Sequence, residues 1–270
     1  MKSNLAQIFR IQRYLNDIKY PDAYRIAREI SNFLKIKKSV SETDIFNRLH
    51  KQEPWEYVRG SAEFCKSSFK VNKDILIPRI ETEQLVYESK RLIEKAKIKN
   101  IIDVGTGSGC IIISLAKLLD NPSSYSFYAT DISSDALKIA KLNEKNILNK
   151  KFIKWFKTNL IEKLPTLSGN TIIVANLPYI PSKQYENLDR SVKQYEPRIA
   201  LDGGDSGLEY YSTLFKQIIH KKVKVKYIYL ETEESNFKQS KKIIKNYFPN
   251  SKVVGIKDCF DRKRFVKVSF

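Results

Sequence analysis

Apolar residues along the chain recur first at helical spacing and later in short runs. In residues 1–53 they return every three or four positions, which is typical of amphipathic helices. The period changes near residue 54, where short apolar segments and turn residues predict a β-hairpin within residues 54–78. Residues 80–97 return to helical spacing. We therefore expect three regions: a helical domain over 1–53, a hairpin linker over 54–78 and a larger domain over 79–270.

From residue 99 onward, strand-like and helix-like runs alternate. The predicted strands are residues 101–104, 126–131, 152–156, 171–176, 226–231, 252–257 and 264–270, and the predicted helices are 110–119, 134–147, 208–220 and 235–247. Such alternation predicts a mostly parallel sheet covered on both faces. Residues 258–263 are too few for a helical crossover, so the last two strands should pair antiparallel. A seven-stranded α/β sheet ending in an antiparallel hairpin is the pattern of Rossmann-like class I methyltransferases.

Composition narrows the class of protein. The chain has 270 residues, is 42% hydrophobic and carries a net charge of +19, so it can build a core and is not disordered throughout. It lacks the run of about 18 apolar residues that a membrane helix needs, and we expect a cytoplasmic protein with no membrane contact. The separated Cys65, Cys110 and Cys259 predict reduced thiols, and with two histidines we expect no metal site. The positive charge indicates either a weak nucleic-acid contact or a lysine-rich composition.

A glycine-rich loop follows the first strand of the large domain and opens a helix. It consists of Gly105, Thr106, Gly107, Ser108 and Gly109. Cys110 stands where a dinucleotide motif would have its last glycine, which argues against a dinucleotide cofactor. Asp131 ends the next strand and is placed to accept hydrogen bonds from two ribose hydroxyls. Together these residues predict an S-adenosylmethionine site, with S-adenosylhomocysteine as the product.

Each of these cofactor residues also has a purely structural interpretation. The glycines could form an ordinary strand-to-helix turn, and Asp131 could cap the helix that starts near Ser133. Asn159 and Leu160 follow the third strand, where enzymes of this class contact adenine, but they could equally form a surface loop.

The tetrapeptide Asn176-Leu177-Pro178-Tyr179 follows the fourth strand, beside the predicted cofactor loop. The Asn176 side-chain oxygen and a backbone carbonyl, such as that of Leu177, could accept both protons of a planar NH2 group. Such positioning supplies much of the rate for a weak nucleophile. Tyr179 offers a ring on which a flat group can stack. The methyl acceptor is therefore predicted to be a glutamine side chain, adenine or guanine. The alternative is that the tetrapeptide is an ordinary Asn-x-Pro turn with no role in the reaction.

These motifs together resemble the HemK/PrmC family of peptide chain release factor N5-glutamine methyltransferases. The resemblance rests on YVRG at residues 57–60, IPRIETE at 77–83, DVGTGSG at 103–109, NLPY at 176–179 and EPRIAL at 196–201. It implies methylation of the Gln in the Gly-Gly-Gln motif of release factors, which the helical domain would grip. It also implies that Asn176, Pro178 and Tyr179 are catalytic and that Asn176, Leu177, Pro178 and Tyr179 bind the substrate, with Asn176 contacting the cofactor as well. Arg79 and Glu196 would bind substrate too, or form a structural ion pair.

The chain departs from the family pattern in ways that leave alternatives open. Leu177 stands where the family usually has proline, and NLPY also occurs in rRNA adenine dimethylases. Leu160 replaces an aromatic residue, and no glycine and glutamine follow Glu231. Two alternative functions therefore stay open. One is a nucleic-acid adenine or guanine N-methyltransferase on the same fold, and the other is a non-catalytic binding module.

Overall fold

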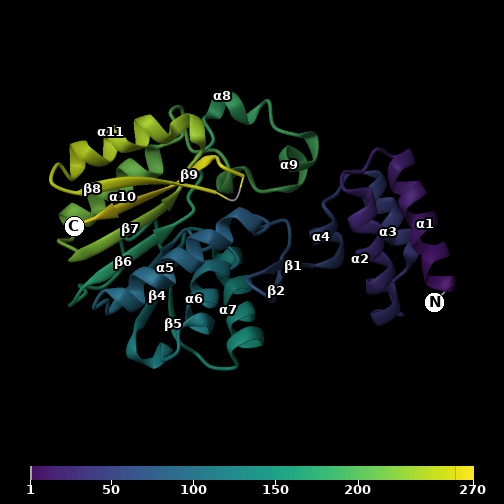
Figure 1. Cartoon of the computed structure of the whole chain (residues 1–270), viewed down its shortest axis with the longest axis horizontal. Coiled ribbons are helices and arrows are strands. Elements are labelled where there is room, and N and C mark those ends of the chain that lie inside the picture. The colour runs from purple at the N-terminus through teal and green to yellow at the C-terminus, as the bar shows by residue number, and fades with distance from the viewer. Residues whose placement is uncertain (1, 259) are drawn as a thin grey trace.

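A computed structural model describes residues 2–258 and 260–270 of the chain, so Cys259 lies outside the described residues. The N-terminal part is helical, as its apolar spacing predicts, and stands to one side of the larger sheet-containing body (Figure 1). Its helices have a separate apolar core that includes Ile11, Ile30 and Trp55. The helices are α1 (Lys2–Asp17), α2 (Ala23–Ile36) and α3 (Glu42–His50).

The linker is a hairpin only in its middle part. It begins with the short helix α4 (Trp55–Arg59), and the antiparallel strands β1 (Ser61–Phe64) and β2 (Ser67–Lys70) follow. Cys65 and Lys66 form the tight turn with φ values of 46° and 56°. Hairpin turns of this kind usually carry glycine or asparagine, so the sequence offered no turn signal at these positions. Glu83 compensates locally, because its carboxylate accepts a hydrogen bond from the Cys65 N–H at 2.8 Å.

A single buried amide ties the linker to the glycine-rich loop. Asn143 accepts a hydrogen bond from the Lys70 N–H at 2.7 Å and donates to the Lys70 carbonyl at 3.1 Å. The same side chain donates to the Ser108 carbonyl at 2.9 Å. The hairpin is therefore held in a fixed place beside the loop.

The large domain contains the predicted seven-stranded sheet, in the order β5-β4-β3-β6-β7-β9-β8 (Figure 1). The first five strands in this order pair parallel, whereas β9 pairs antiparallel with both β7 and β8. The prediction of an antiparallel terminal hairpin is confirmed. The strands are β3 (Asn100–Val104), β4 (Ser126–Asp131), β5 (Ile153–Lys157), β6 (Thr171–Ala175), β7 (Val225–Glu231), β8 (Lys252–Lys257) and β9 (Lys263–Ser269).

Helices cover both faces of this sheet, and successive residues of a strand enter opposite cores. In β3, Ile101 packs into the core under α5 and α6, whereas Ile102 packs into the core under α10 and α11. One layer consists of α5 (Glu83–Lys95), α6 (Cys110–Leu118) and α7 (Ser134–Leu148), and the other of α10 (Glu209–His220) and α11 (Phe237–Tyr247) (Figure 1).

Short helices fill the connection between β6 and α10, and the sequence did not predict them. They are α8 (Ser182–Tyr185), α9 (Arg190–Tyr195) and the 3₁₀ turn η3 (Arg198–Ala200). Segments of one or two turns are too short to display a helical period. The remaining 3₁₀ turns are η1 (Ile80–Thr82), η2 (Pro122–Ser124) and η4 (Glu234–Asn236). Since η1 precedes α5, the helix predicted from residue 80 begins as a tighter turn.

Candidate active site

A cleft opens at the carboxyl ends of the parallel strands, where open α/β sheets bind ligands. It encloses about 1040 Å³ of empty space, part of which is continuous with the solvent. Most of the residues that the sequence singled out lie along it. Those in the lining are Arg79, Gly105, Thr106, Gly107, Ser108, Asp131, Asn159, Leu160, Asn176, Leu177 and Pro178. Gly109, Tyr179 and Glu196 are not in the lining.

The glycine-rich loop turns sharply between β3 and α6. The N–H groups of Gly105 and Thr106 both donate to the Thr130 carbonyl at 2.9 Å, which fixes the start of the loop to β4. Gly105 has a φ of 71°, and a Cβ there would lie 2.7 Å from the Leu177 side chain. At Gly109, a Cβ would meet the side chains of Ile113, Ala140 and Trp155. Gly105 therefore permits contact with the tetrapeptide, whereas Gly109 permits close packing of α6 against α7 and β5.

Asp131 braces the loop from the end of β4. Its Oδ2 accepts a hydrogen bond from the Gly107 N–H at 2.9 Å and its Oδ1 accepts one from the Ser133 N–H at 2.8 Å. The helix cap itself is Ser133, whose hydroxyl accepts from the Ala136 N–H. Each Asp131 oxygen keeps acceptor capacity for a further hydrogen bond. Burial raises the pKa of this carboxyl group above its usual value, against the effect of the two N–H donors.

Asp103 lies beneath the loop and is fully buried. Its Oδ2 accepts a hydrogen bond from the Thr106 hydroxyl at 2.6 Å, and its Oδ1 has no hydrogen-bond partner among the described residues. Burial raises the pKa of Asp103 to about 7. The carboxyl group is therefore costly to ionise in the folded chain.

This raised pKa predicts a pH-dependent effect of Asp103→Asn on stability. In the unfolded chain Asp103 ionises near pH 4, so wild-type stability decreases as the pH rises from there to about 7. The variant cannot ionise at this position. We expect similar stability at low pH but a gain of about 4 kcal/mol for the variant at pH 8. Urea unfolding from pH 5 to 8 measures the difference in the free energy of unfolding. Asp135→Asn, at an exposed position of α7, is the control. A difference that does not change with pH would contradict the prediction.

Leu177 is fixed by contacts that a proline could not reproduce. Its N–H donates to the Tyr211 hydroxyl at 3.2 Å, and that hydroxyl donates in turn to the Glu231 carbonyl. Proline has no N–H to donate. Leu177 therefore lacks the fixed φ of the family's proline, and its backbone is instead held by a hydrogen bond to Tyr211 of α10.

Asn176 and Tyr179 contact a buried polar group that the sequence did not reveal. Asn176 Nδ2 donates to Thr82 Oγ1 at 3.3 Å, and the Tyr179 hydroxyl donates to Glu231 Oε1 at 3.2 Å. Arg264 donates to the Tyr179 hydroxyl at 3.4 Å. Burial, followed by the charge of Glu231, raises the pKa of Tyr179. The hydroxyl end of Tyr179 is thus directed to the buried carboxyl end of β7, and its stacking role stays a prediction.

Arg79 and Glu196 form the ion pair that was one of the two interpretations of these residues. Arg79 Nη2 lies 2.6 Å from Glu196 Oε1, and the Glu196 side chain is only 2% exposed. The pair joins the segment after the hairpin to the end of α9. Arg79 also lines the cleft, whereas Glu196 faces a separate hollow beside the helical segment. Substrate binding by Glu196 therefore stays a prediction without a cleft contact.

Several lining residues were not among those chosen from the sequence. Ile132 and Ile199 are 53% and 54% exposed at the cleft, and Thr82 lies buried beneath it. Ile132 could have been found because it follows Asp131, and Ile199 because it lies within the EPRIAL segment of residues 196–201. The other unanticipated lining residues include Asp74, Ile75, Leu76, Pro78, Thr158 and Tyr210.

The described residues contain neither a membrane-spanning helix nor a cluster of metal ligands. No helix within residues 2–258 and 260–270 is both long and apolar enough to cross a membrane. Among those same residues, no group of three His, Cys, Asp or Glu side chains is arranged to hold a metal ion.

The sheet order, the terminal hairpin and the position of the cleft define the class I S-adenosylmethionine-dependent methyltransferase fold. The chain belongs to the release factor glutamine methyltransferase family. It is 35% identical over 226 residues to the release factor glutamine methyltransferase of Lactococcus lactis, covering 84% of this chain and 81% of that one. It is 33% identical to the enzyme of that name from Flavobacterium psychrophilum, covering 83% and 78%. Residues 82–184 match the family model of ribosomal protein L11 methyltransferase (PrmA).

Solved structures support the fold at low sequence identity. The catalytic domain of human METTL16 in complex with MAT2A 3′UTR hairpin 1 has a TM-score of 0.59 at 16% identity, covering 75% of this chain and 74% of that one. The N-terminal domain of human METTL16 in complex with SAH has a TM-score of 0.50 at 15% identity, covering 75% of each chain. These two likenesses concern the fold alone.

Proposed function

We propose that this protein transfers a methyl group from S-adenosylmethionine to the side-chain N5 of the Gln in the Gly-Gly-Gln motif of peptide chain release factors. The observation that supports this most is the placement of Asn176, whose carboxamide lines the cleft beside the glycine-rich loop. Family membership adds the substrate class. We place this activity in the cytoplasm, where translation termination occurs.

The residues of the cleft fit S-adenosylmethionine. A Cβ on Gly107 would meet nothing within 4 Å, so open space lies over the loop. Asp131 would accept hydrogen bonds from the ribose hydroxyls, while Asn159 and the apolar Ile132 and Leu160 would contact adenine. When bound, the cofactor supplies an electrophilic methyl group: the glutamine nitrogen bonds to its carbon, the C–S electron pair stays on sulfur to leave S-adenosylhomocysteine, and one N–H proton goes to water.

The residues of the tetrapeptide would orient the acceptor. Asn176 Oδ1 and the Leu177 carbonyl would each accept one proton of the glutamine NH2 group, while Pro178 shapes the slot. Tyr179 and Arg79 would complete the substrate contacts. Holding a weakly nucleophilic amide nitrogen in a fixed orientation is the main contribution that these side chains make to the rate.

The experiment that tests the function is methyl transfer from labelled S-adenosylmethionine to a purified release factor. The same factor with Gln→Ala in its Gly-Gly-Gln motif is the control, and total rRNA is a third acceptor. We expect label on the intact factor alone. Label on rRNA alone would replace the proposal with a nucleic-acid N-methyltransferase, and no label on any acceptor with cofactor still bound would point to a non-catalytic binding protein.

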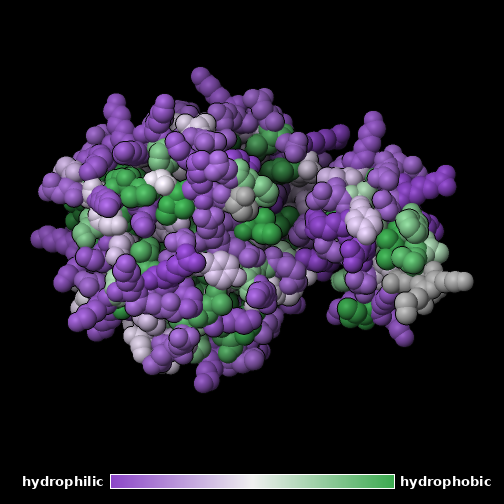
Figure 2. Space-filling view, viewed as in Figure 1, coloured by the Kyte–Doolittle hydropathy of each residue, from purple (hydrophilic) through white to green (hydrophobic). Residues whose placement is uncertain are grey.

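The helical segment is proposed to recognise the body of the release factor. Figure 2 shows an apolar area on this segment, and its exposed large apolar side chains are Leu5, Phe9, Tyr24 and Ile36. Leu5 and Phe9 are one helical turn apart on α1, so they share a face. Exposed apolar patches of this kind commonly mark protein contacts.

This role predicts a selective effect of the double variant L5E/F9E. The KM for a whole release factor should rise about 10-fold, because two apolar contacts are lost. The KM for a short Gly-Gly-Gln peptide should stay the same, since the peptide reaches only the cleft. Ile219→Glu on α10, which replaces another half-exposed apolar residue, is the control. Equal changes for peptide and whole factor would contradict this role.

A weak nucleic-acid contact is a second, subordinate part of the proposal, favoured by the distribution of charge. Residues 210–230 and 235–257 contain eleven lysines and no Asp or Glu. Most of these lysines are exposed on and around α10, α11 and β8. Phosphate-backbone binding weakens steeply with salt. Retention of total rRNA should therefore be measurable near 50 mM salt and lost near 200 mM, and retention that does not depend on salt would contradict an electrostatic contact.

A further inference from the structure

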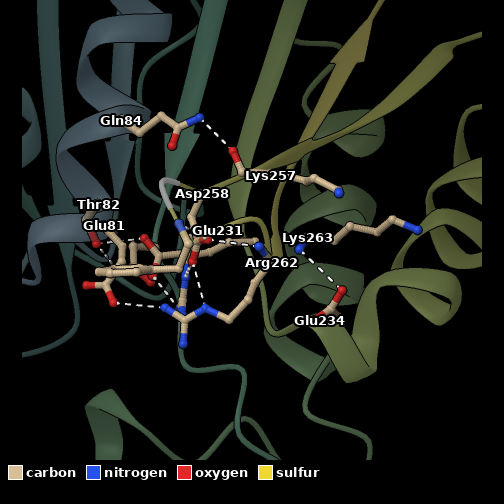
Figure 3. A network of polar contacts seen from close by, with 12 residues as sticks. Glu81, Thr82, Gln84, Glu231, Glu234, Lys257, Asp258, Arg262 and Lys263 are labelled. Atoms are coloured by element: carbon tan, nitrogen blue, oxygen red, sulfur yellow. Dashed lines mark hydrogen bonds and ion pairs between the residues drawn. The ribbon is translucent and has the colours of Figure 1, made fainter.

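A chain of buried hydrogen bonds runs from the Asn176 carboxamide into the core. Asn176 Nδ2 donates to Thr82 Oγ1 at 3.3 Å, and the Thr82 hydroxyl donates to Glu231 Oε2 at 2.7 Å. Thr82 is 2% exposed and Glu231 is fully buried. Figure 3 shows Thr82 and Glu231 facing each other within a network of polar side chains that includes Glu81, Asp258 and Arg262. Three elements far apart in the sequence, η1, β6 and β7, therefore meet at one polar chain.

The surroundings of Glu231 keep its carboxylate an acceptor. Oε2 accepts from Thr82, and Oε1 accepts from the Tyr179 hydroxyl at 3.2 Å. The Arg264 guanidinium lies 3.7 Å from Oε1 and is itself paired with Asp258. Burial, and to a lesser extent Glu81, raise the pKa of Glu231, whereas Thr82, Arg264 and Tyr179 oppose that rise. Because its two oxygens accept hydrogen bonds from the Thr82 and Tyr179 hydroxyls and the Arg264 guanidinium lies beside Oε1, Glu231 is the acceptor in each of these contacts.

The direction of every proton in the chain follows from this carboxylate. Thr82 has a single hydroxyl proton, and Glu231 receives it. The Thr82 oxygen can then only accept, so it must face the NH2 end of Asn176. The opposite end, Oδ1, has no hydrogen-bond partner among the described residues, and Asn176 lines the cleft. One Nδ2 proton is used by Thr82, and Oδ1 at the other end of the carboxamide is the acceptor left for whatever enters.

We propose that Thr82 and Glu231 form an orientation lock that keeps Asn176 Oδ1 directed into the cleft and thereby selects a carboxamide acceptor over a carboxylate. The proposal rests on the proposed function and adds a basis for its specificity. Rotating the carboxamide by half a turn would place two oxygens without a proton between them, at Asn176 and Thr82. Losing such a hydrogen bond in a buried setting lowers the population of the rotated state roughly 10-fold or more. Thr82 and Glu231 are positioning residues that act through Asn176.

The first test compares Thr82→Val with Thr82→Ser. Valine has the shape of threonine but lacks the hydroxyl, whereas serine keeps it. In Thr82→Val we expect kcat on a release factor to fall at least 10-fold, with the KM values for the factor and the cofactor changed less than 3-fold. Thr82→Ser should restore kcat to within 3-fold of wild type. Thr213→Val removes a hydroxyl that donates only within α10 and is the matched control. Full activity of Thr82→Val, or an equal loss in Thr82→Ser, would overturn the lock.

The second test reads the direction of the carboxamide without methyl transfer. A release factor with Gln→Glu in its Gly-Gly-Gln motif presents a carboxylate, which Asn176 Oδ1 repels. When the carboxamide can rotate, its NH2 end can bind that carboxylate. The Glu form should therefore inhibit Thr82→Val at about 10-fold lower concentration than it inhibits the wild type or Thr213→Val. Unchanged inhibition would overturn the proposal.

A third measurement separates failure of the lock from failure of the proposed function. If the wild type leaves the intact factor unmethylated, the proposed function fails, and the lock is judged on the enzyme alone. The Asn176 carboxamide signals in an ¹⁵N NMR spectrum are identified by their disappearance in Asn176→Ala. We expect slow proton exchange in the wild type and Thr82→Ser, and fast exchange in Thr82→Val. Equal exchange in all three proteins would overturn the lock. Thermal unfolding confirms that each variant is folded.

Discussion

Replacing Asn176 with Ala should reduce methyl transfer to a release factor roughly 100- to 1,000-fold. The alanine variant loses the oxygen that would hold one acceptor proton, so the amide nitrogen is no longer fixed in line with the methyl group. Cofactor affinity should stay within a few-fold of wild type, because under the proposed function the loop and Asp131 would supply most of the contacts to that ligand. Single-turnover rates and calorimetric titration with the cofactor measure the two quantities.

The interpretation of this result depends on a matched surface control. Asn187 is exposed beyond α8, so Asn187→Ala removes the same carboxamide far from the cleft and should leave the rate unchanged. A parallel loss of rate and cofactor affinity in Asn176→Ala would contradict a role in orienting the acceptor. It would instead limit Asn176 to binding the cofactor.

Replacing Asp131 with Ala should weaken S-adenosylmethionine binding on the order of 100-fold. The carboxylate would accept charge-assisted hydrogen bonds from two ribose hydroxyls, and it already holds the Gly107 and Ser133 N–H groups in place. Loss of the side chain therefore removes ligand contacts and loosens the loop together. Asp131→Asn should lie between wild type and the alanine variant, since the amide oxygen can still accept.

Calorimetric titration with the cofactor and with S-adenosylhomocysteine measures this effect. Asp135→Ala serves as the control, because Asp135 is an exposed residue of α7 that pairs with Lys138. Wild-type affinity in Asp131→Ala would limit Asp131 to supporting the loop. The ribose contact would then have to be assigned to another residue of the cleft.

The sheet was predictable because its signals are local. Each buried strand of the large domain is a short apolar run, and the glycine-rich loop lies between one such run and a helix. Asp131 was found for the same reason, since its place at the end of β4 follows from the strand pattern alone. The antiparallel β9 followed from the short connection before it.

The parts that the sequence missed depend on distant contacts. Thr82 and Glu231 are 149 positions apart, yet they share a hydrogen bond below the cleft. Glu231 was noticed only as the end of a strand, and nothing local indicates that Tyr179 would face it. The turn at Cys65 and Lys66 contains no glycine to mark it in the sequence. The hydrogen bond that supports it comes from Glu83 of another element. Such features become visible only when the elements are brought together.

The hydrogen bonds of Asn143 have a consequence for local unfolding. Strand β2 cannot separate from the glycine-rich loop without breaking both bonds to Lys70 or the bond to Ser108. A buried carboxamide that loses its hydrogen-bond partners is unfavourable. Breaking the Asn143 contacts on one side therefore costs nearly as much free energy as separating β2 from the loop completely. The hairpin and the loop therefore form one cooperative opening unit, and their amide protons should exchange with solvent at a shared free energy.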